Sequence, residues 1–288
     1  MKLYPIQCGK FKLDGGAMFG VVPKTLWEKT NPADERNLIE LATRSLLVED
    51  GKKLILIDCG LGNKQDEKFF GHYSLWGDDS LDKNLKKYGF VCDDITDVFL
   101  THLHFDHCGG AIEWNDDKTG YRPAFKNAHF WTNEEHWKWA TEPNPREKAS
   151  FLKENILPMQ GSGQLNFLPT PQNGNYGFAP DLKMDVIFVD GHTEKQMLPV
   201  IQYQEKTIVF TADLIPTAGH IPQVYVMGYD TRPLLTMEEK AKFLKQCVDN
   251  EYLLFFEHDA HNELASLKMT EKGVRLDETF SMNDVFGY

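Results

Sequence analysis

Short apolar runs alternate with amphipathic segments along this chain of 288 residues. The runs Arg44–Glu49 and Lys53–Asp58 lie on either side of Gly51, a pattern that predicts a β-hairpin. Other apolar runs of strand length cover residues 98–101, 128–131, 185–190, 206–211 and 253–256. Helical spacing of apolar residues covers 80–88, 133–140, 146–157 and 237–250. Strands that alternate with helices in this way predict an α/β fold.

Residues that can bind a metal ion stand directly after four of the predicted strands. Three of them are His192, Asp213 and His258. The ends of strands are where α/β folds usually place their chemistry. A polar residue at one strand end is common, but residues of this kind at four ends favour a shared metal site.

The densest group of such residues follows the strand predicted over 98–101. It reads Thr101-His102-Leu103-His104-Phe105-Asp106-His107-Cys108-Gly109-Gly110. Imidazole and carboxylate groups are both zinc ligands, so this density indicates metal binding. His102 and His104 alternate and can point the same way from an extended segment, whereas the adjacent Asp106 and His107 point elsewhere. One short loop can therefore serve two neighbouring ions.

Composition narrows the class of protein. Hydrophobic residues make up 41% of the chain and the mean hydropathy is −0.44, which is typical of a globular protein. No apolar run is as long as a membrane span, and the first residues lack the apolar core of a signal peptide. The net charge of −12 disfavours a nucleic-acid partner, which needs a basic face.

The five cysteines are widely spaced, and none forms a Cys-x-x-Cys pair. This usage is typical of a reduced, cytoplasmic protein. The sequence contains no repeat, low-complexity tract or linker, so we expect a single domain over residues 1–288. We expect no membrane partner, and a homodimer is compatible with the sequence.

In the order and spacing of its motifs the chain resembles the metallo-β-lactamase superfamily. The matching motifs are Asp58-Cys59-Gly60, His102 to His107, Gly191-His192-Thr193, Asp213 and His258. The resemblance implies an α/β fold of the αββα four-layer sandwich type, with a dinuclear metal site at the edges of the two sheets. It also implies a division of ligands: His102, His104 and His192 for one ion, Asp106, His107 and His258 for the other, and Asp213 as the bridge. Asp58 matches the carboxylate that orients a ligand histidine in this superfamily.

Within the superfamily, the histidine-rich motif is most similar to the N-acyl-homoserine lactonases, which are quorum-quenching hydrolases. The di-iron oxidoreductases usually have Glu at the position of His104, the RNA-processing enzymes have a basic exosite, and true β-lactamases generally lack the bridging aspartate. The resemblance implies two Zn²⁺ ions per chain, and the ligands also suit Co²⁺, Mn²⁺ or Fe²⁺. We expect a hydroxide that bridges the ions to attack the lactone carbonyl, with Asp106 as the catalytic residue that shuttles the proton.

Other functions stay open at this stage. A phosphotriesterase or a thioesterase would use the same centre and differ in the shape of the pocket, which the sequence does not resolve. A non-catalytic binding protein on this fold is the alternative of a different class. The complete ligand set argues against it.

Two positions depart from the lactonase pattern. Many members read Gly-His-Thr-Pro-Gly where this chain has Gly191-His192-Thr193-Glu194-Lys195. Some lactonases also carry a tyrosine shortly after the bridging aspartate, which holds the substrate carbonyl. Here the segment after Asp213 ends in His220, for which a catalytic role and a loop position are equally good interpretations.

Aromatic residues and a methionine in early and loop segments predict a substrate pocket. For each residue alone, core packing is the commoner explanation. As a group they are suited to wall an apolar cleft for an acyl chain. The pocket residues are Met18, Phe19, Trp27, Phe69, Phe70 and Trp137. The expected partner is therefore a small molecule, an acylated lactone.

Overall fold

The computed structural model describes residues 1–287, which form two compact units. The first unit contains residues 1–10 and 43–183, and the second contains residues 11–42 and those from 184 onwards. The two units therefore alternate along the chain. The expectation of a single domain stays a prediction.

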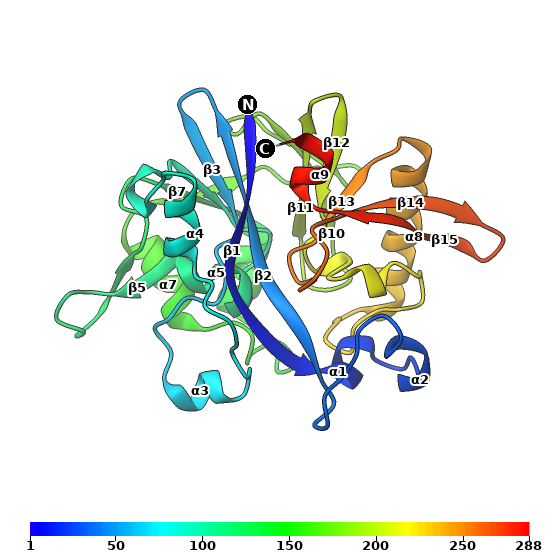
Figure 1. The fold of residues 1–288 in the computed structure, drawn as a ribbon. Helices are drawn as coiled ribbons and strands as arrows, with labels where there is room; N and C mark the ends of the chain where they lie inside the picture. The colour runs from blue at the N-terminus through cyan, green and yellow to red at the C-terminus, as the bar shows by residue number, and fades with distance from the viewer. Residues whose placement is uncertain (288) are drawn as a thin grey trace. The chain divides into compact units, whose positions relative to one another are not determined.

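Two mixed sheets and a short two-stranded ribbon organise the chain, with helices on their flanks (Figure 1). The six-stranded sheet contains, in spatial order, β1 (Lys2–Asp14), β2 (Leu38–Asp50), β3 (Lys53–Ile57), β4 (Asp97–Phe99), β7 (His129–Asn133) and β8 (Leu165–Leu168). The seven-stranded sheet contains β15 (Gly273–Phe280), β14 (Leu264–Thr270), β13 (Leu253–Phe255), β12 (Lys206–Phe210), β11 (Gln196–Tyr203), β10 (Met184–Val189) and β9 (Tyr176–Ala179). The ribbon pairs β5 (Ile112–Trp114) with β6 (Tyr121–Pro123).

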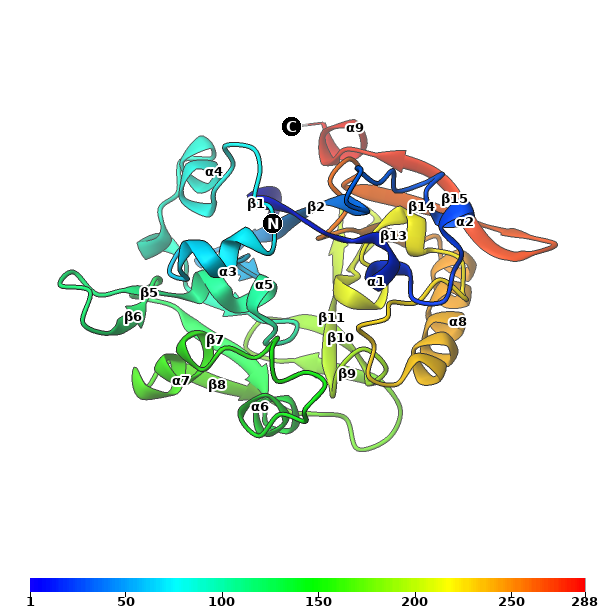
Figure 2. The same cartoon turned by 90° about the horizontal axis from the view of Figure 1, so that it is seen from below.

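The helices are short, apart from one in the second unit. The first unit carries α3 (Glu67–Gly71), α4 (Leu81–Lys87), α5 (Phe105–Cys108), α6 (Glu134–Thr141), α7 (Lys153–Gly161) and the 3₁₀ turns η1 (Cys92–Asp94) and η2 (Gly109–Ala111). The second carries α1 (Gly15–Phe19), α2 (Lys24–Trp27), α8 (Pro233–Asp249), α9 (Met282–Phe286) and the 3₁₀ turns η3 (Ala212–Leu214) and η4 (Ala218–His220). Figure 1 shows α8 crossing β14 and β15, against which it packs, and Figure 2 shows the β5–β6 ribbon beside α7.

Parallel strand pairs bring the ends of neighbouring strands to the same edge. In the first unit, β3 and β4 are parallel, with Ile57 opposite Phe99. In the second unit, β12 and β13 are parallel, with Phe210 opposite Phe255. The residues that follow each pair therefore emerge side by side, as the sequence pattern predicts.

Several predicted elements are confirmed. β2 and β3 form the expected hairpin, in which Asp50 lies opposite Lys53. The helix predicted over 80–88 is α4, and the hydroxyl of Ser80 caps it by accepting from the Lys83 N–H. The helix predicted over 237–250 is α8, which starts earlier, at Pro233, because proline is well suited to the first helical turn.

Other elements differ from the prediction. The helix predicted over 146–157 begins only at Lys153, and the residues before it form turns. The side-chain oxygen of Asn144 accepts from the N–H groups of Arg146 and Glu147, which is an Asx-type turn that competes with a helix. The sequence analysis also missed eight strands: β1, β5, β6, β8, β9, β11, β14 and β15. The outer strand β15 lacks a regular alternation of buried and exposed residues, so its pattern gave little signal.

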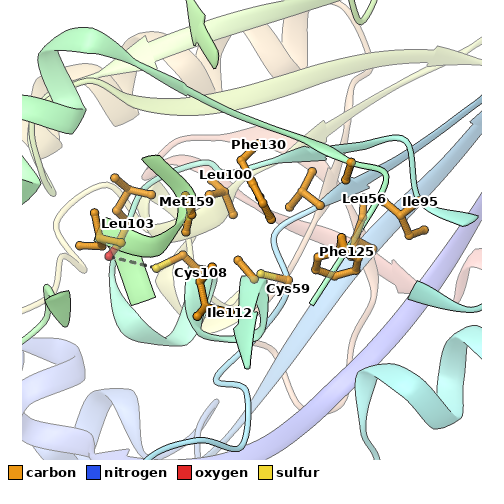
Figure 3. Packing of buried hydrophobic residues seen from close by; sticks show 14 of the residues in the cluster. Leu56, Cys59, Ile95, Leu100, Leu103, Cys108, Ile112, Phe125, Phe130 and Met159 are labelled. Atoms are coloured by element: carbon orange, nitrogen blue, oxygen red, sulfur yellow. Dashed lines mark hydrogen bonds between the residues drawn. The ribbon is translucent and has the colours of Figure 1, made fainter. Parts of the chain in front are cut away.

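Figure 3 shows part of the core of the first unit. Two buried cysteines lie in this core, and each thiol donates to a backbone carbonyl. Cys59 donates to His107 O and Cys108 donates to Leu103 O, both at 3.3 Å. Burial raises the pKa of the Cys108 thiol to about 12. No helix among residues 1–287 is both long enough and apolar enough to cross a bilayer.

The segment after β3 approaches the end of the histidine-rich loop closely enough to require glycine. The Gly110 N–H donates to Gly60 O at 2.9 Å, and a Cβ on Gly110 would overlap the Cys59 carbonyl oxygen. A side chain here would push the two segments apart.

We expect Gly110→Ala to lower the free energy of unfolding by about 2 kcal/mol, because an added methyl group has no room. Chemical denaturation measures the effect. Gly71→Ala is the matched control, since no atom lies within 4 Å of the added Cβ. Equal stability of the two variants would contradict the close approach.

Candidate functional site

The carboxylate of Asp58 joins two strand ends in the first unit. Its Oδ1 accepts from the Thr101 N–H at 2.8 Å, and its Oδ2 accepts from the Thr101 hydroxyl at 2.6 Å. Oδ2 also lies 3.1 Å from Nδ1 of His107. Asp58 has a φ of 54°, an unfavourable conformation that non-glycine residues retain mostly at functional sites. Asp58 therefore occupies the orienting position that the resemblance implied.

His102 and His104 each direct a ring nitrogen toward the other. Nε2 of His102 and Nδ1 of His104 are 3.0 Å apart, and both residues are buried. The opposite nitrogens have their own partners. Nδ1 of His102 lies 3.1 Å from the Thr101 hydroxyl, and Nε2 of His104 lies 3.3 Å from Oε1 of Glu147. Two facing imidazole nitrogens at this distance fit two ligands of one metal ion.

The backbone around His104 is fixed on both sides. The Leu103 N–H donates to Nε2 of His136 at 2.8 Å, and the Phe105 N–H donates to Ser150 O at 2.9 Å. His136 is fully buried and accepts this bond, so its Nε2 carries no proton. These bonds hold the loop in the extended conformation that alternating ligands require.

Asp106 and His107 lie on α5, directly after the loop. The His107 ring packs against that of His102, with centroids 3.8 Å apart. Nε2 of His107 lies 3.9 Å from Oδ1 of Asp106. The structure thus groups the four predicted ligands of the first unit, and all four are buried. Burial and the nearby charge of Asp106 together raise the pKa of Tyr73 to about 12.

In the second unit, Asp213 lies between two histidines. Its Oδ2 is 3.1 Å from Nε2 of His192, and its Oδ1 is 3.0 Å from Nε2 of His258. All three residues are buried. The preceding residue, Ala212, has a φ of 40°, a second unfavourable conformation at a strand end. A carboxylate that presents one oxygen to each of two ligand histidines has the arrangement that a bridging ligand needs.

The Nδ1 atoms of His192 and His258, which point away from Asp213, also have hydrogen-bond partners. Nδ1 of His192 lies 2.9 Å from Oδ1 of Asp230, and Nδ1 of His258 lies 2.8 Å from Ala42 O. Both contacts hold a proton on Nδ1, so Nε2 is the ring nitrogen that a metal would bind in place of a proton. Burial disfavours a charge on His192, but Asp213 and Asp230 outweigh it and raise the pKa of His192 to about 10. The carboxylates therefore favour positive charge at this position.

Glu194 and Lys195, the departures from Gly-His-Thr-Pro-Gly, are held by ion pairs. Oε2 of Glu194 accepts from Arg232 at 2.6 Å, and Nζ of Lys195 lies 3.0 Å from Oδ2 of Asp190. Lys195 has a φ of 49°, in the left-handed region that favours glycine. The loop thus keeps the glycine conformation without glycine, and the ion pairs help to offset its cost.

Helix α8 fixes the segment before His192. Its residue Glu239 is buried and accepts from the N–H groups of Asp190 and Gly191 at 2.8 and 2.9 Å. Burial outweighs these bonds and raises the pKa of Glu239 to about 7. The backbone that carries His192 therefore depends on a carboxylate with an unusually high affinity for a proton.

His220 uses both ring nitrogens within the second unit. Nε2 lies 2.9 Å from Met18 O and Nδ1 lies 2.8 Å from the Thr217 hydroxyl. The ring also stacks on Phe19, with centroids 4.1 Å apart. Burial lowers the pKa of His220 to about 3. This geometry favours the structural interpretation, and a catalytic role for His220 stays a prediction.

The predicted pocket residues fall into two groups. Met18, Phe19 and Trp27 lie in the second unit, where each is at most 2% exposed and Phe19 stacks on Trp27. Phe69, Phe70 and Trp137 lie in the first unit, where Trp137 belongs to the core. Phe69 and Phe70 are half-buried on α3. Of the six, these two phenylalanines have the exposure that a pocket wall needs.

The residues present fit a metal centre by their chemistry. The seven predicted ligands are five imidazoles and two carboxylates, all buried. Each histidine has a partner for its non-ligating nitrogen, which is the usual second layer of a metal site. Buried histidine and aspartate clusters of this kind are consistent with a dinuclear site.

The sequence analysis missed His136 and Asp230. His136 follows the helix cap Asn133, and nothing in its spacing distinguishes it from an ordinary helical histidine. Asp230 lies in a loop three residues before Pro233, where a carboxylate is unremarkable. Only the folded arrangement, in which Asp230 meets His192, gives it a role.

Comparison with known proteins shows the family to which the chain belongs. A family model described as the metallo-beta-lactamase superfamily matches residues 38–258, more than half of the chain. An N-acyl homoserine lactonase of Bacillus thuringiensis is 25% identical over 275 residues, which cover 91% of this chain and 94% of the relative. A protein of the same description from Bacillus cereus is 26% identical over 275 residues, with the same coverage.

Two solved structures are similar over almost their whole length. A "probable metal-dependent hydrolase" from Staphylococcus aureus has a TM-score of 0.85 at 28% identity and covers 97% of this chain and 96% of its own. A dizinc quorum-quenching lactonase in complex with a product, N-hexanoyl-L-homoserine, has a TM-score of 0.77 at 23% identity, with coverages of 98% and 95%. At this lower identity the likeness shows the fold.

We expect Glu239→Gln to change how stability depends on pH. Because the pKa of Glu239 is raised from 4.5 to about 7, the folded protein keeps a proton between these pH values that the unfolded chain releases. The wild type should therefore lose up to about 3 kcal/mol of stability from this group as pH rises from 5 to 8, and the variant should not.

Urea unfolding at pH 5 and pH 8, at equal metal content, measures this difference. The neighbouring exposed Glu238, changed to Gln, is the matched control and should behave as the wild type. The same pH dependence in all three proteins would refute the assignment.

Proposed function

Because the chain belongs to the metallo-β-lactamase superfamily, with its fold of two mixed sheets and flanking helices, it is a metal-dependent hydrolase, and we propose that it opens the lactone ring of N-acyl-homoserine lactones. The observation that carries the dinuclear centre is Asp213, which offers one oxygen to each of two buried histidines. The curated relatives described as N-acyl homoserine lactonases support the substrate class.

We assign the ligands as the resemblance implies, with zinc as the ion. His102, His104 and His192 would hold one ion, Asp106, His107 and His258 would hold the other, and Asp213 would serve both. The bound ions supply Lewis acidity and activate water for attack on an ester carbonyl. The protein contributes fixed imidazole orientations, since every outward nitrogen in this set has a partner.

Asp106 is the residue that we assign to proton transfer. It lies at the start of α5, where its carboxylate is nearly buried and beside His107. The Tyr73 hydroxyl, whose pKa is raised to about 12, stays protonated near this carboxylate at neutral pH. A carboxylate among such neighbours can accept a proton and return it to the leaving alcohol.

An aromatic group in the first unit is suited to contact an acyl chain. Phe105, between the ligands His104 and Asp106, packs against Phe69 and Tyr73 with centroids 5.4 and 4.7 Å apart. Phe69 also lines a cavity of about 500 Å³, but its wall is mostly polar, with Lys64, Lys68 and Glu154 beside Trp114 and Tyr121, and none of the predicted metal ligands lines it. We therefore assign the acyl chain to the Phe69, Tyr73 and Phe105 rings and not to this cavity. This group supports an apolar chain rather than a short, polar substrate.

We expect the zinc-loaded protein to open N-acyl-homoserine lactones and to prefer longer chains. Each methylene that leaves water contributes about 0.8 kcal/mol. We therefore expect kcat/KM to rise about fourfold per methylene, until the acyl chain extends past the aromatic group of Phe69, Tyr73 and Phe105. Titration of the acid released on ring opening measures the rate. Phe69→Ala should reduce the preference for long chains, whereas Phe178→Ala, at an exposed position on β9, should not. Hydrolysis of a phosphotriester or thioester without any lactone opening would refute the lactonase assignment.

We also expect Asp213→Ala to lose both ions and His192→Ala to lose mainly one. A bridging carboxylate neutralises two cations at once, so its removal leaves them to repel each other. Elemental analysis of protein purified without chelator gives the metal content. His72→Ala, which changes an exposed histidine, is the control and should keep two ions. Unchanged metal content in Asp213→Ala would show that Asp213 is not the bridge.

A further inference from the structure

We infer that Glu147 is a positioning residue for His104, which it orients and polarises from the side opposite to the metal. The inference rests on the metal centre of the proposed function and is independent of the lactone substrate. Nothing in the histidine-rich motif indicates this residue, because Glu147 lies 43 positions further along the chain.

The carboxylate of Glu147 is aimed at the outward nitrogen of His104. Its Oε1 lies 3.3 Å from Nε2 of His104, while Nδ1 of the same ring faces His102. The Glu147 and His104 side chains are 3% and 8% exposed. A buried carboxylate beside this nitrogen keeps its proton on Nε2 and leaves the lone pair of Nδ1 for a metal.

Two donors hold the other oxygen of the carboxylate in place. Oε2 accepts from the indole N–H of Trp139 and from the amide of Asn144, both at 2.6 Å. The backbone of Glu147 is fixed as well, because its N–H donates to Asn144 Oδ1 at 3.2 Å. The side chain therefore has little freedom, and its Oε1 faces the histidine.

The same turn is tied to the backbone beside His104. The carbonyl of Glu147 accepts from the Ser150 N–H at 2.8 Å, and the carbonyl of Ser150 accepts from the Phe105 N–H at 2.9 Å. The ring of Phe151 lies 4.8 Å from that of His104. The turn over 144–151 thus fixes the backbone, the ring plane and the outward nitrogen of one ligand. This explains why the segment does not form the helix that its sequence predicts.

A carboxylate in this position strengthens its histidine as a ligand. Removal of such a partner typically costs ten- to a hundredfold in metal affinity, even though the partner never touches the metal. Glu147→Gln is the informative change, because it keeps the size of the side chain and removes the charge. We expect the ion bound by His104 to dissociate about tenfold faster, while the other ion leaves at the wild-type rate.

Transfer of zinc from the loaded protein to a chromogenic chelator measures both dissociation phases. Asp97→Asn is the matched control, because Asp97 is also buried and accepts from an indole N–H, that of Trp131, at 2.8 Å. The Asp97→Asn substitution should change the rate of neither zinc dissociation phase. Equal acceleration in both variants, or none in Glu147→Gln, would overturn the inference.

A second variant covers the case in which Glu147→Gln does not fold. Trp139→Phe keeps an aromatic ring and removes one donor to Oε2. It should accelerate the same phase by a smaller factor, and an unchanged phase would count against the inference. A protein that opens no lactone but shows the faster phase would refute only the lactonase assignment. A wild type that holds fewer than two ions would overturn the metal centre and this inference together.

Discussion

The hydrogen bonds of one carboxylate, that of Asp58, determine how the histidine-rich loop leaves its sheet. Asp58 holds the backbone and hydroxyl of Thr101 and the outward nitrogen of His107. It thereby links the end of β3 to the loop after β4 and to helix α5. Its unfavourable φ is retained because three partners converge on the side chain. Without this carboxylate, His107 would lose the partner of its outward nitrogen and Thr101 would lose two hydrogen bonds.

The second unit uses the same principle with other groups. Asp230 and the carbonyl of Ala42 hold the outward nitrogens of His192 and His258, and Glu239 holds the backbone before His192. Buried carboxylates are costly unless they are hydrogen-bonded or offset by positive charge. The pKa of His192 is raised for the same reason, because the carboxylates of Asp213 and Asp230 stabilise a positive charge beside them. The geometry of each unit is therefore prepared for positive charge before any ion arrives.

The local pattern of the sequence predicted the fold and the positions of the metal-competent residues after the strands, because both depend on short segments. Apolar runs mark β3, β4, β12 and β13, and each polar residue directly after them lies where parallel pairing places it. The partners of the ligands were not predictable in the same way. His104 meets Glu147 through a turn whose sequence also suits a helix, and His192 meets Asp230 across 38 residues. For His220 the sequence left a catalytic role and a loop position equally open, and its hydrogen bonds to Thr217 and Met18 favour the structural interpretation.

The alternation of the two units along the chain has a consequence for biosynthesis. Residues 11–42 belong to the second unit, yet the rest of that unit begins only at residue 184. A nascent chain must therefore carry the apolar side chains of Phe11, Phe19 and Trp27 through the synthesis of about 140 further residues before their partners emerge. Closing so long a loop is slow and leaves an aggregation-prone intermediate exposed. The second unit therefore cannot complete its core until the last third of the chain has been synthesised.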